Sequence, residues 1–126
     1  MKSLSLVVLP VRLAICRLSP DEPIPERPAH CGFWSVTRTD EELSIVLPEE
    51  TVSAHWKAEK GWRCMKVLEL LDFGITGILA SLAVPLAEAG VSIFALSTYD
   101  TDYILVREDN LEKAKQVLLA SGHVVK

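Results

Sequence analysis

Two apolar runs meet across a short polar tip in the last third of the chain, and this pattern limits the fold more than any other in the sequence. Residues 91–96 (Val-Ser-Ile-Phe-Ala-Leu) and residues 103–106 (Tyr-Ile-Leu-Val) each have the composition of a buried strand. The tip between them therefore lies at one end of a sheet. It carries hydroxyl and carboxylate groups suited to binding an ammonium group, on Thr98, Tyr99, Asp100, Thr101 and Asp102.

The sequence before this hairpin predicts a strand followed by a helix. Residues 62–70 alternate imperfectly between apolar and polar side chains, and a glycine-rich turn follows at residues 72–77. Gly90 is placed to end a helix whose apolar residues recur at helical spacing, namely Ile78, Leu79, Leu82 and Leu86. Pro85 cannot donate a backbone hydrogen bond to the carbonyl of Ser81, so we expect a bend or a loosened turn there.

A second helix and a final strand complete this half of the chain. Asp109 and Glu112 form an N-cap pair, and Gly122 is placed to end the helix. One apolar face of this helix is made by Leu111, Ala114, Val117 and Leu118. With a short strand at residues 123–125, the order is strand, helix, strand, strand, helix, strand. This order predicts a ferredoxin-like (βαββαβ) unit with two helices on one face of an antiparallel sheet.

The first half of the chain carries a weaker copy of the same order. Residues 4–9 predict a strand, and residues 11–18 fit either a short helix or a strand that continues past Pro10. A proline-rich connection at residues 20–28 precedes a hairpin of residues 33–38 and 43–47, after which Pro48-Glu49-Glu50 opens a short helix. The predicted fold class is therefore α+β, with two ferredoxin-like units in tandem: a degenerate first unit at residues 1–60 and a second unit at residues 61–126.

Composition and motif content narrow the function. The chain has 126 residues, 49% of them hydrophobic, and a net charge of −4, which argues against a nucleic-acid-binding protein because such proteins need clustered Lys and Arg. The apolar N-terminal run resembles a secretory leader, but Pro10 and Arg12 interrupt it, and no segment approaches the ~20 apolar residues of a membrane span. The expectation is a cytoplasmic protein with no membrane partner.

The cysteines and histidines suggest neither a metal site nor a catalytic pair. Cys16, Cys31 and Cys64 are odd in number and lack ligand spacing, so we expect no disulfide framework, no metal and no cofactor. His30 and Cys31 are adjacent, but neighbouring side chains usually point apart, and a loop histidine beside a buried thiol is the alternative. His55 and His123 have no evident catalytic partner, and we therefore expect no enzymatic activity.

Residues 74–107 resemble the ACT domain family. The resemblance rests on Gly-Ile-Thr-Gly-Ile at the helix start, Ser-Leu-Ala-Val-Pro-Leu-Ala-Glu inside the helix and Leu-Ser-Thr-Tyr-Asp-Thr-Asp after it. More narrowly, the sequence is similar to small bacterial tandem-ACT proteins, to the CASTOR-type arginine sensors of animal cells and to aspartate-kinase-like ACT regulatory domains. The resemblance is strong over residues 62–122 and fainter over residues 33–50.

The resemblance implies a non-catalytic regulatory module, a ligand sensor that binds an amino acid or a similar small metabolite at an interface between ACT units. Because the animal sensors carry more ACT units in one chain, it also implies a homodimer. The family's ligand-binding positions correspond here to Gly74, Ile75, Thr76, Gly77, Ser81 and Leu82 around the helix start, and to Thr98, Tyr99, Asp100, Thr101 and Asp102 at the strand end. Arginine specificity does not transfer, because ligand choice in the family depends on both sides of the interface.

Physical chemistry supports this assignment independently. A helix N-terminus presents unpaired amides that suit a carboxylate, and glycines allow close backbone approach. Asp100 and Asp102 lie two apart, so on a strand they would share a face, and a bound ammonium group would relieve their repulsion. One zwitterion would then bridge the helix start and the strand end, with Asp102 as the strongest single candidate.

Each of these features has a structural alternative. The two glycines could only shape a turn, the two aspartates could be solvated tip residues, and Ser81 could cap the carbonyl gap left by Pro85. Trp34, Trp56 and Trp62 fit core or interface packing better than a ligand cage. An interaction module with a vestigial ligand site is therefore the alternative function.

Overall fold

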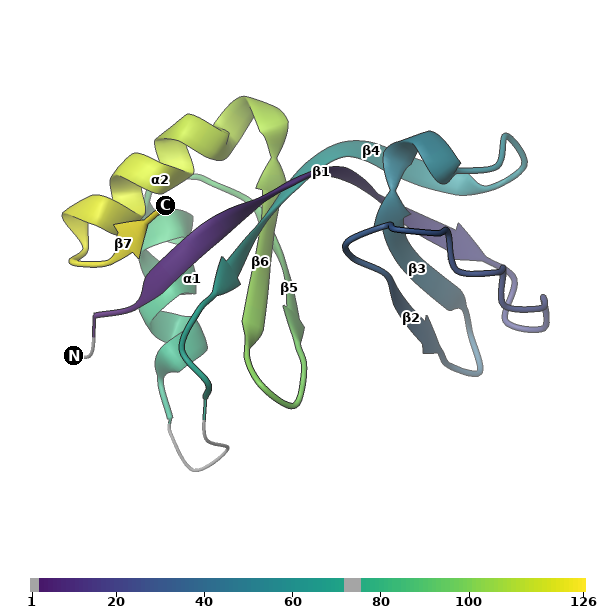
Figure 1. Cartoon of the computed structure of the whole chain (residues 1–126), viewed down its shortest axis with the longest axis horizontal. Coiled ribbons are helices and arrows are strands. Elements are labelled where there is room, and N and C mark those ends of the chain that lie inside the picture. The colour runs from purple at the N-terminus through teal and green to yellow at the C-terminus, as the bar shows by residue number, and fades with distance from the viewer. Residues whose placement is uncertain (1–2, 72–75) are drawn as a thin grey trace. The chain divides into compact units, whose positions relative to one another are not determined.

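The computed structural model describes residues 3–71 and 76–126 of the chain (Figure 1). It divides into two compact units. The helical unit consists of residues 1–10 and 63–126, and the strand unit consists of residues 11–62. Residues 1–10 thus group with the C-terminal part of the chain, whereas the sequence-based division kept residues 1–60 together.

The helical unit has the predicted order of elements. Its strands are the first part of β1 (Ser5–Leu18), the last part of β4 (Lys57–Val67), β5 (Ile93–Ser97), β6 (Asp102–Arg107) and β7 (Val124–Val125). They lie in the order β1-β4-β6-β5, and β7 adds to β1 in parallel through Ser5 and Val124. The predicted hairpin is confirmed, because β5 and β6 pair antiparallel from Ile93–Val106 to Ser97–Asp102. The strand beside β4 is β1, while β7 contributes only two residues.

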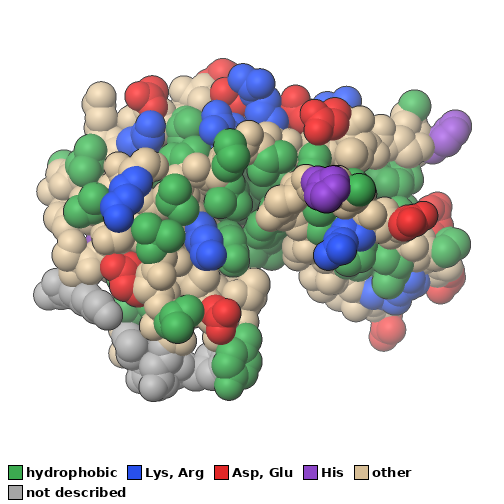
Figure 2. All heavy atoms as spheres, in the orientation of Figure 1, with side chains coloured by type: hydrophobic (Ala, Val, Ile, Leu, Met, Phe, Trp, Pro, Cys, Tyr) green, Lys and Arg blue, Asp and Glu red, His purple; other side chains and the backbone are tan. Residues whose placement is uncertain are grey.

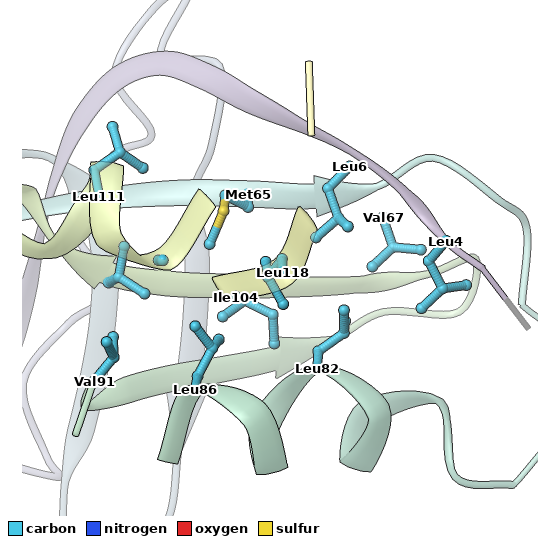
Figure 3. Packing of buried hydrophobic residues seen from close by; sticks show 12 residues of the cluster. Leu4, Leu6, Met65, Val67, Leu82, Leu86, Val91, Ile104, Leu111 and Leu118 are labelled. Atoms are coloured by element: carbon cyan, nitrogen blue, oxygen red, sulfur yellow. The ribbon is translucent and has the colours of Figure 1, made fainter. Parts of the chain in front are cut away.

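Two helices bury their apolar faces against this sheet. They are α1 (Ile78–Glu88) and α2 (Leu111–Ala120), and Figure 3 shows their leucines pointing toward side chains of β1, β4 and β6. The fully buried members of this cluster include Leu4, Leu6, Met65, Val67, Leu82, Leu86, Ile104, Val106 and Leu118. Burying a leucine or isoleucine stabilises a fold by about 1.5–3 kcal/mol, so this cluster is the main source of stability in the helical unit.

Both helices end just before the predicted glycines, but the N-cap predicted for the second helix is wrong. Gly90 and Gly122 have positive φ angles of 77° and 94° just after the two helices. At the first of them, the amide of Val91 bonds back to the carbonyl of Leu86 at 2.9 Å, as in a Schellman cap. The expected N-cap at Asp109 is not formed, because Glu108–Asn110 make a tight 3₁₀ turn and α2 starts only at Leu111.

The strand unit contains no α-helix; all of its residues are described. The second part of β1 continues past Pro10, which settles the alternative in favour of a strand. It pairs antiparallel with β3 (Leu43–Pro48), which pairs antiparallel with β2 (Ser35–Arg38). The short helix expected after Pro48 is a 3₁₀ turn, η1 (Glu49–Thr51). A second core forms here from Ala14, Cys16, Leu18, Leu43, Ile45 and Leu47, against which Trp34 and Trp56 pack.

Among the residues described, no helix is long and apolar enough to cross a membrane. The same part of the chain holds no group of His, Cys, Asp and Glu side chains able to bind a metal ion. The three cysteines are free thiols, and burial raises the pKa of Cys64 to about 12, which makes this thiol unreactive. Acidic, basic and apolar side chains are intermixed on the visible face of the molecule (Figure 2).

Candidate functional site

The polar tip between β5 and β6 lies against the segment that leads from β4 toward α1. The amide of Leu71 donates to the carbonyl of Asp100 at 2.7 Å, and the hydroxyl of Thr101 donates to the carbonyl of Val67 at 2.8 Å. These two bonds bring together the strand end and the approach to the helix. Gly74 and Ile75, two of the expected ligand-binding residues, lie outside the described residues.

Two threonines at the tip are used to shape it. The amide of Thr98 donates to the carbonyl of Thr101 at 2.9 Å, and the hydroxyl of Thr98 approaches the same carbonyl at 3.2 Å. Thr101 is only 3% exposed, and its hydroxyl is engaged with Val67. The two side chains therefore hold the tip closed and fix it to β4.

Asp102 and its neighbours provide the charge at this end of the sheet. The hydroxyl of Ser97 donates to Oδ1 of Asp102 at 2.6 Å, across the last pair of the β5–β6 ladder. Asp102 is partly buried, whereas Asp100 is exposed and Tyr99 is 81% exposed. Within the described part of the chain, Oδ2 of Asp102 has no hydrogen-bond partner. A fixed, partly buried carboxylate with one free oxygen is a suitable acceptor for an ammonium group.

Helix α1 begins in a way that leaves its first amides open. Gly77 is the N-cap, with a left-handed φ of 78°, and its carbonyl accepts the first helical bond from Ser81 at 2.9 Å. Among the residues described, no side chain caps this end, and the first turn holds no acidic residue. Thr76 precedes the cap and is exposed. Uncapped amides and the helix dipole together favour a negative group at this position.

The other two expected site residues on α1 are turned inward. The hydroxyl of Ser81 donates to the carbonyl of Ile78 at 2.7 Å, and Ser81 is 6% exposed. Leu82 is fully buried in the core beneath the helix. The structure therefore buries the side chains of Thr101, Ser81 and Leu82, engages the hydroxyl of the exposed Thr98 in the turn, and leaves Asp100, Asp102 and the start of α1 accessible.

His123 is the polar residue of this unit that sequence reasoning missed. It is 3% exposed, its Nδ1 accepts a hydrogen bond from the amide of Leu4 at 3.1 Å, and its Nε2 lies 3.2 Å from the carbonyl of Ser81. Because the amide of Leu4 can only donate, the proton belongs on Nε2, which donates to Ser81. This is the carbonyl that Pro85 leaves without its helical partner.

This contact corrects the alternative role expected for Ser81, which was to cap the carbonyl left unpaired by Pro85. The hydroxyl of Ser81 does not cap the gap left by Pro85; His123 does so through its Nε2. The signal in the sequence was Pro85 itself, since a proline inside a helix predicts an unpaired carbonyl four residues earlier. Its partner could not be identified, because His123 lies 42 residues from Ser81 along the chain.

Comparison with known families matches both parts of the chain. The model described as the ACT domain matches residues 57–120, and a second model, described as an N-terminal domain, matches residues 12–55. The rat protein named cytosolic arginine sensor for mTORC1 subunit 1 is 38% identical over 98 residues, which cover 70% of this chain and 29% of that protein. The chain thus spans less than a third of the length of this relative.

Solved structures share the fold over nearly the whole chain. A protein from Agrobacterium tumefaciens has a TM-score of 0.93 and 38% identity, covering 100% of this chain and 94% of that one. The ligand-free regulatory subunit of aspartate kinase from Thermus thermophilus has a TM-score of 0.67 at 8% identity, covering 95% and 99%. At this low identity, the second likeness shows the fold alone.

Proposed function

The chain belongs to the ACT domain family, and from this premise we propose that it is a non-catalytic regulatory module that binds a free amino acid. The observation that carries the proposal is the pair of bonds that join the tip to the segment before α1. Asp102, a partly buried carboxylate, adjoins this tip, and Gly77, the N-cap of α1, follows the joined segment along the chain. The relative named as an arginine sensor supports an amino acid as the ligand class and the cytoplasm as the location.

In the proposed complex, the two ends of a zwitterion are bound by different elements. The α-carboxylate would accept hydrogen bonds from the backbone at the start of α1, beside Thr76 and Gly77. The ammonium group would bind Asp102, with Asp100 adding negative charge from the exposed part of the tip. Thr98 and Thr101 would act by holding the tip in place, and Ser81 and Leu82 by fixing the first turns of the helix.

A second copy of the chain is the proposed partner. Four large apolar side chains around this end of the helical unit are exposed: Leu68, Leu70, Leu79 and Tyr99, with exposed fractions of 41%, 79%, 38% and 81%. Such a concentration of exposed apolar groups favours an interface. We propose a homodimer in which these side chains close over the ligand, and we interpret the strand unit as a degenerate ACT-like unit that completes the tandem arrangement.

The alternative is an interaction module whose ligand site no longer functions. The observation in its favour is that three of the expected site side chains, Ser81, Leu82 and Thr101, are buried and engaged inside the protein. In that case the exposed apolar side chains would bind another protein, and no metabolite would change the stability of the chain.

Thermal unfolding in the presence of individual free amino acids tests the proposal. A ligand at about a hundred times its dissociation constant should add about 2.7 kcal/mol to the free energy of unfolding. Asp102→Asn removes the charge but keeps an oxygen for Ser97, so the shift should disappear while the unliganded protein stays folded. Asp109→Asn removes an equal charge from an exposed position on η2 (Glu108–Asn110) and should leave the shift intact. A flat response to the whole panel would favour the interaction module.

A further inference from the structure

The strand unit contains a separate cavity of about 370 Å³, outside the proposed amino-acid site. Its walls come from one stretch of chain, residues 27–34, which runs from the end of the proline-rich connection to the residue before β2. Small-molecule pockets typically have volumes of ~300–1,000 Å³, so this cavity suits a small ligand. The function proposed for the helical unit makes no use of it.

The polar groups in the wall of this cavity are mainly hydrogen-bond donors. Arg27 contributes a guanidinium group that forms no ion pair with any described residue, and no carboxylate lines the cavity. The indole Nε1 of Trp34 is buried and has no acceptor among the described groups. His30 adds an imidazole. This nitrogen is itself inaccessible to solvent, so a ligand in the cavity would contact the ring of Trp34 and not its N–H.

The backbone of this loop is held in uncommon conformations. His30 has a φ of 53°, and it is the one non-glycine residue with a positive φ among the residues described. Gly32 has a φ of 74°, and the amide of Phe33 bonds to the carbonyl of Cys31 at 2.8 Å, which defines a tight γ-turn of the rare, strained type. Strained residues of this kind cluster at ligand-binding loops.

The loop is also anchored to the sheet beside it. The guanidinium group of Arg38 on β2 donates to the carbonyl of Pro20, and at 2.8 Å to that of Glu22, which ties the start of the proline-rich connection to the strand. Trp34 packs against the core of the strand unit. These contacts fix the start of the proline-rich connection and, at Trp34, the last residue of the cavity-forming segment.

We propose that this cavity binds a small organic carboxylate with an apolar, planar body. The carboxylate would accept hydrogen bonds from the Arg27 guanidinium, and the body would pack on the rings of Phe33 and Trp34. This site goes beyond the proposed regulatory function, because it lies in the other unit and selects for a negative ligand without needing an ammonium group.

Titration of the ¹⁵N-labelled protein with benzoate tests this inference through the indole signals in its NMR spectrum. Trp34→Phe identifies the Trp34 signal among those of the three tryptophans. Benzoate should shift this signal in a saturable way, and benzamide, which has the same shape without the charge, should bind at least about tenfold more weakly. The rest of the spectrum reports whether each variant is folded.

Charge-matched variants of the same unit complete the test. Arg27→Gln should weaken benzoate binding by about tenfold or more, since it removes the one guanidinium group at the cavity. Lys57→Gln, at the exposed start of β4, removes an equal charge and should change the affinity for benzoate less than about twofold. Equal binding of benzamide, an unchanged affinity in Arg27→Gln or the absence of a saturable shift would each overturn the inference. None of these results affects the amino-acid proposal, whose panel and variants probe the helical unit.

Discussion

The two helices of the helical unit lie in the same layer but differ in how they start and in what they expose. Helix α2 has Glu112 in its first turn and follows the acidic η2 (Glu108–Asn110), so its positive end is already neutralised. Helix α1 follows its N-cap, Gly77, without a side-chain cap from any described residue, and it carries no charged residue before Glu88. Its exposed positions include Leu79 and Val84. Helix α1, which follows the segment bonded to the polar tip, is therefore the one with apolar side chains on its outer surface and no acidic residue in its first turn.

Because of this difference, the stability of α1 depends more on contacts with other elements than the stability of α2 does. Helix α2 has an amphipathic sequence of ten residues, contains no proline and buries its apolar face in the core. Helix α1 contains Pro85, and the gap in its backbone bonding is filled from outside by His123. The stability of α1 thus depends on a residue next to β7, and through Nδ1 of that residue on the start of β1.

Truncation of the shared core should have the largest effect and should be similar for both helices. Leu82 on α1 and Leu118 on α2 are both fully buried. Leu82→Ala and Leu118→Ala should each lower the free energy of unfolding by about 2–5 kcal/mol, because each leaves a cavity. Chemical denaturation measures this, with the exposed Leu119→Ala as the control, expected within about 0.5 kcal/mol of the parent protein. A much smaller loss at Leu82 would mean that α1 is loosely packed.

Removal of the His123 side chain should destabilise α1 selectively. His123→Ala leaves the carbonyl of Ser81 and the amide of Leu4 unpaired, at a cost of about 1–3 kcal/mol for each buried group. Hydrogen exchange should show faster opening of amides in α1 than in α2. The measurement is equilibrium unfolding combined with exchange of individual amides.

A double-mutant cycle with Pro85 tests the cause of this effect. Pro85→Ala restores the amide that can bond to the carbonyl of Ser81, so it should reduce the loss caused by His123→Ala. The expected coupling is about 0.5–3 kcal/mol, the range for residues that share one hydrogen-bond network. Strict additivity would show that His123 acts by packing alone.

Glycine substitutions compare the start of one helix with the end of the other. Gly77 and Gly122 have positive φ angles of 78° and 94°, and a Cβ at either position would meet no described atom within 4 Å. Gly77→Ala and Gly122→Ala should therefore each cost about 1–2 kcal/mol from backbone conformation alone. Thermal unfolding measures both losses. If Gly77 also faces the ligand carboxylate, only Gly77→Ala should weaken amino-acid binding beyond its effect on stability.

The sequence predicted these elements more reliably than it predicted their contacts. The order of elements, the β5–β6 hairpin and the positions of Gly90 and Gly122 followed from local patterns, which periodicity and glycine chemistry determine. The place of β1 beside β4 could not be predicted, because it depends on pairing between residues far apart in the chain. The contact of His123 with Ser81 was hidden for the same reason.

At the candidate site, the sequence identified the right segments but not the direction of each side chain. Asp102 and Gly77 lie where a ligand could reach them, whereas Thr101 and Leu82 are buried. Residue type alone cannot distinguish these cases, since a threonine at a tip serves equally well to bind a ligand or to close a turn. The cavity near Trp34 was missed because its walls come from an irregular loop, where no periodicity predicts the shape.

The substitution with the smallest expected effect tests the difference between the two helix starts most directly. Ala80 is exposed in the first turn of α1, and Ala80→Glu would give this helix the negative charge that α2 already has. The charge should stabilise the unliganded protein by about 0.3–1 kcal/mol through the helix dipole. If the start of α1 binds a carboxylate, the same charge should weaken amino-acid binding, so stability and affinity should change in opposite directions. Ala80→Gln, of similar size without the charge, should leave affinity nearly unchanged. Equal affinities of the Glu and Gln variants, measured by calorimetry, would place the ligand carboxylate away from this helix.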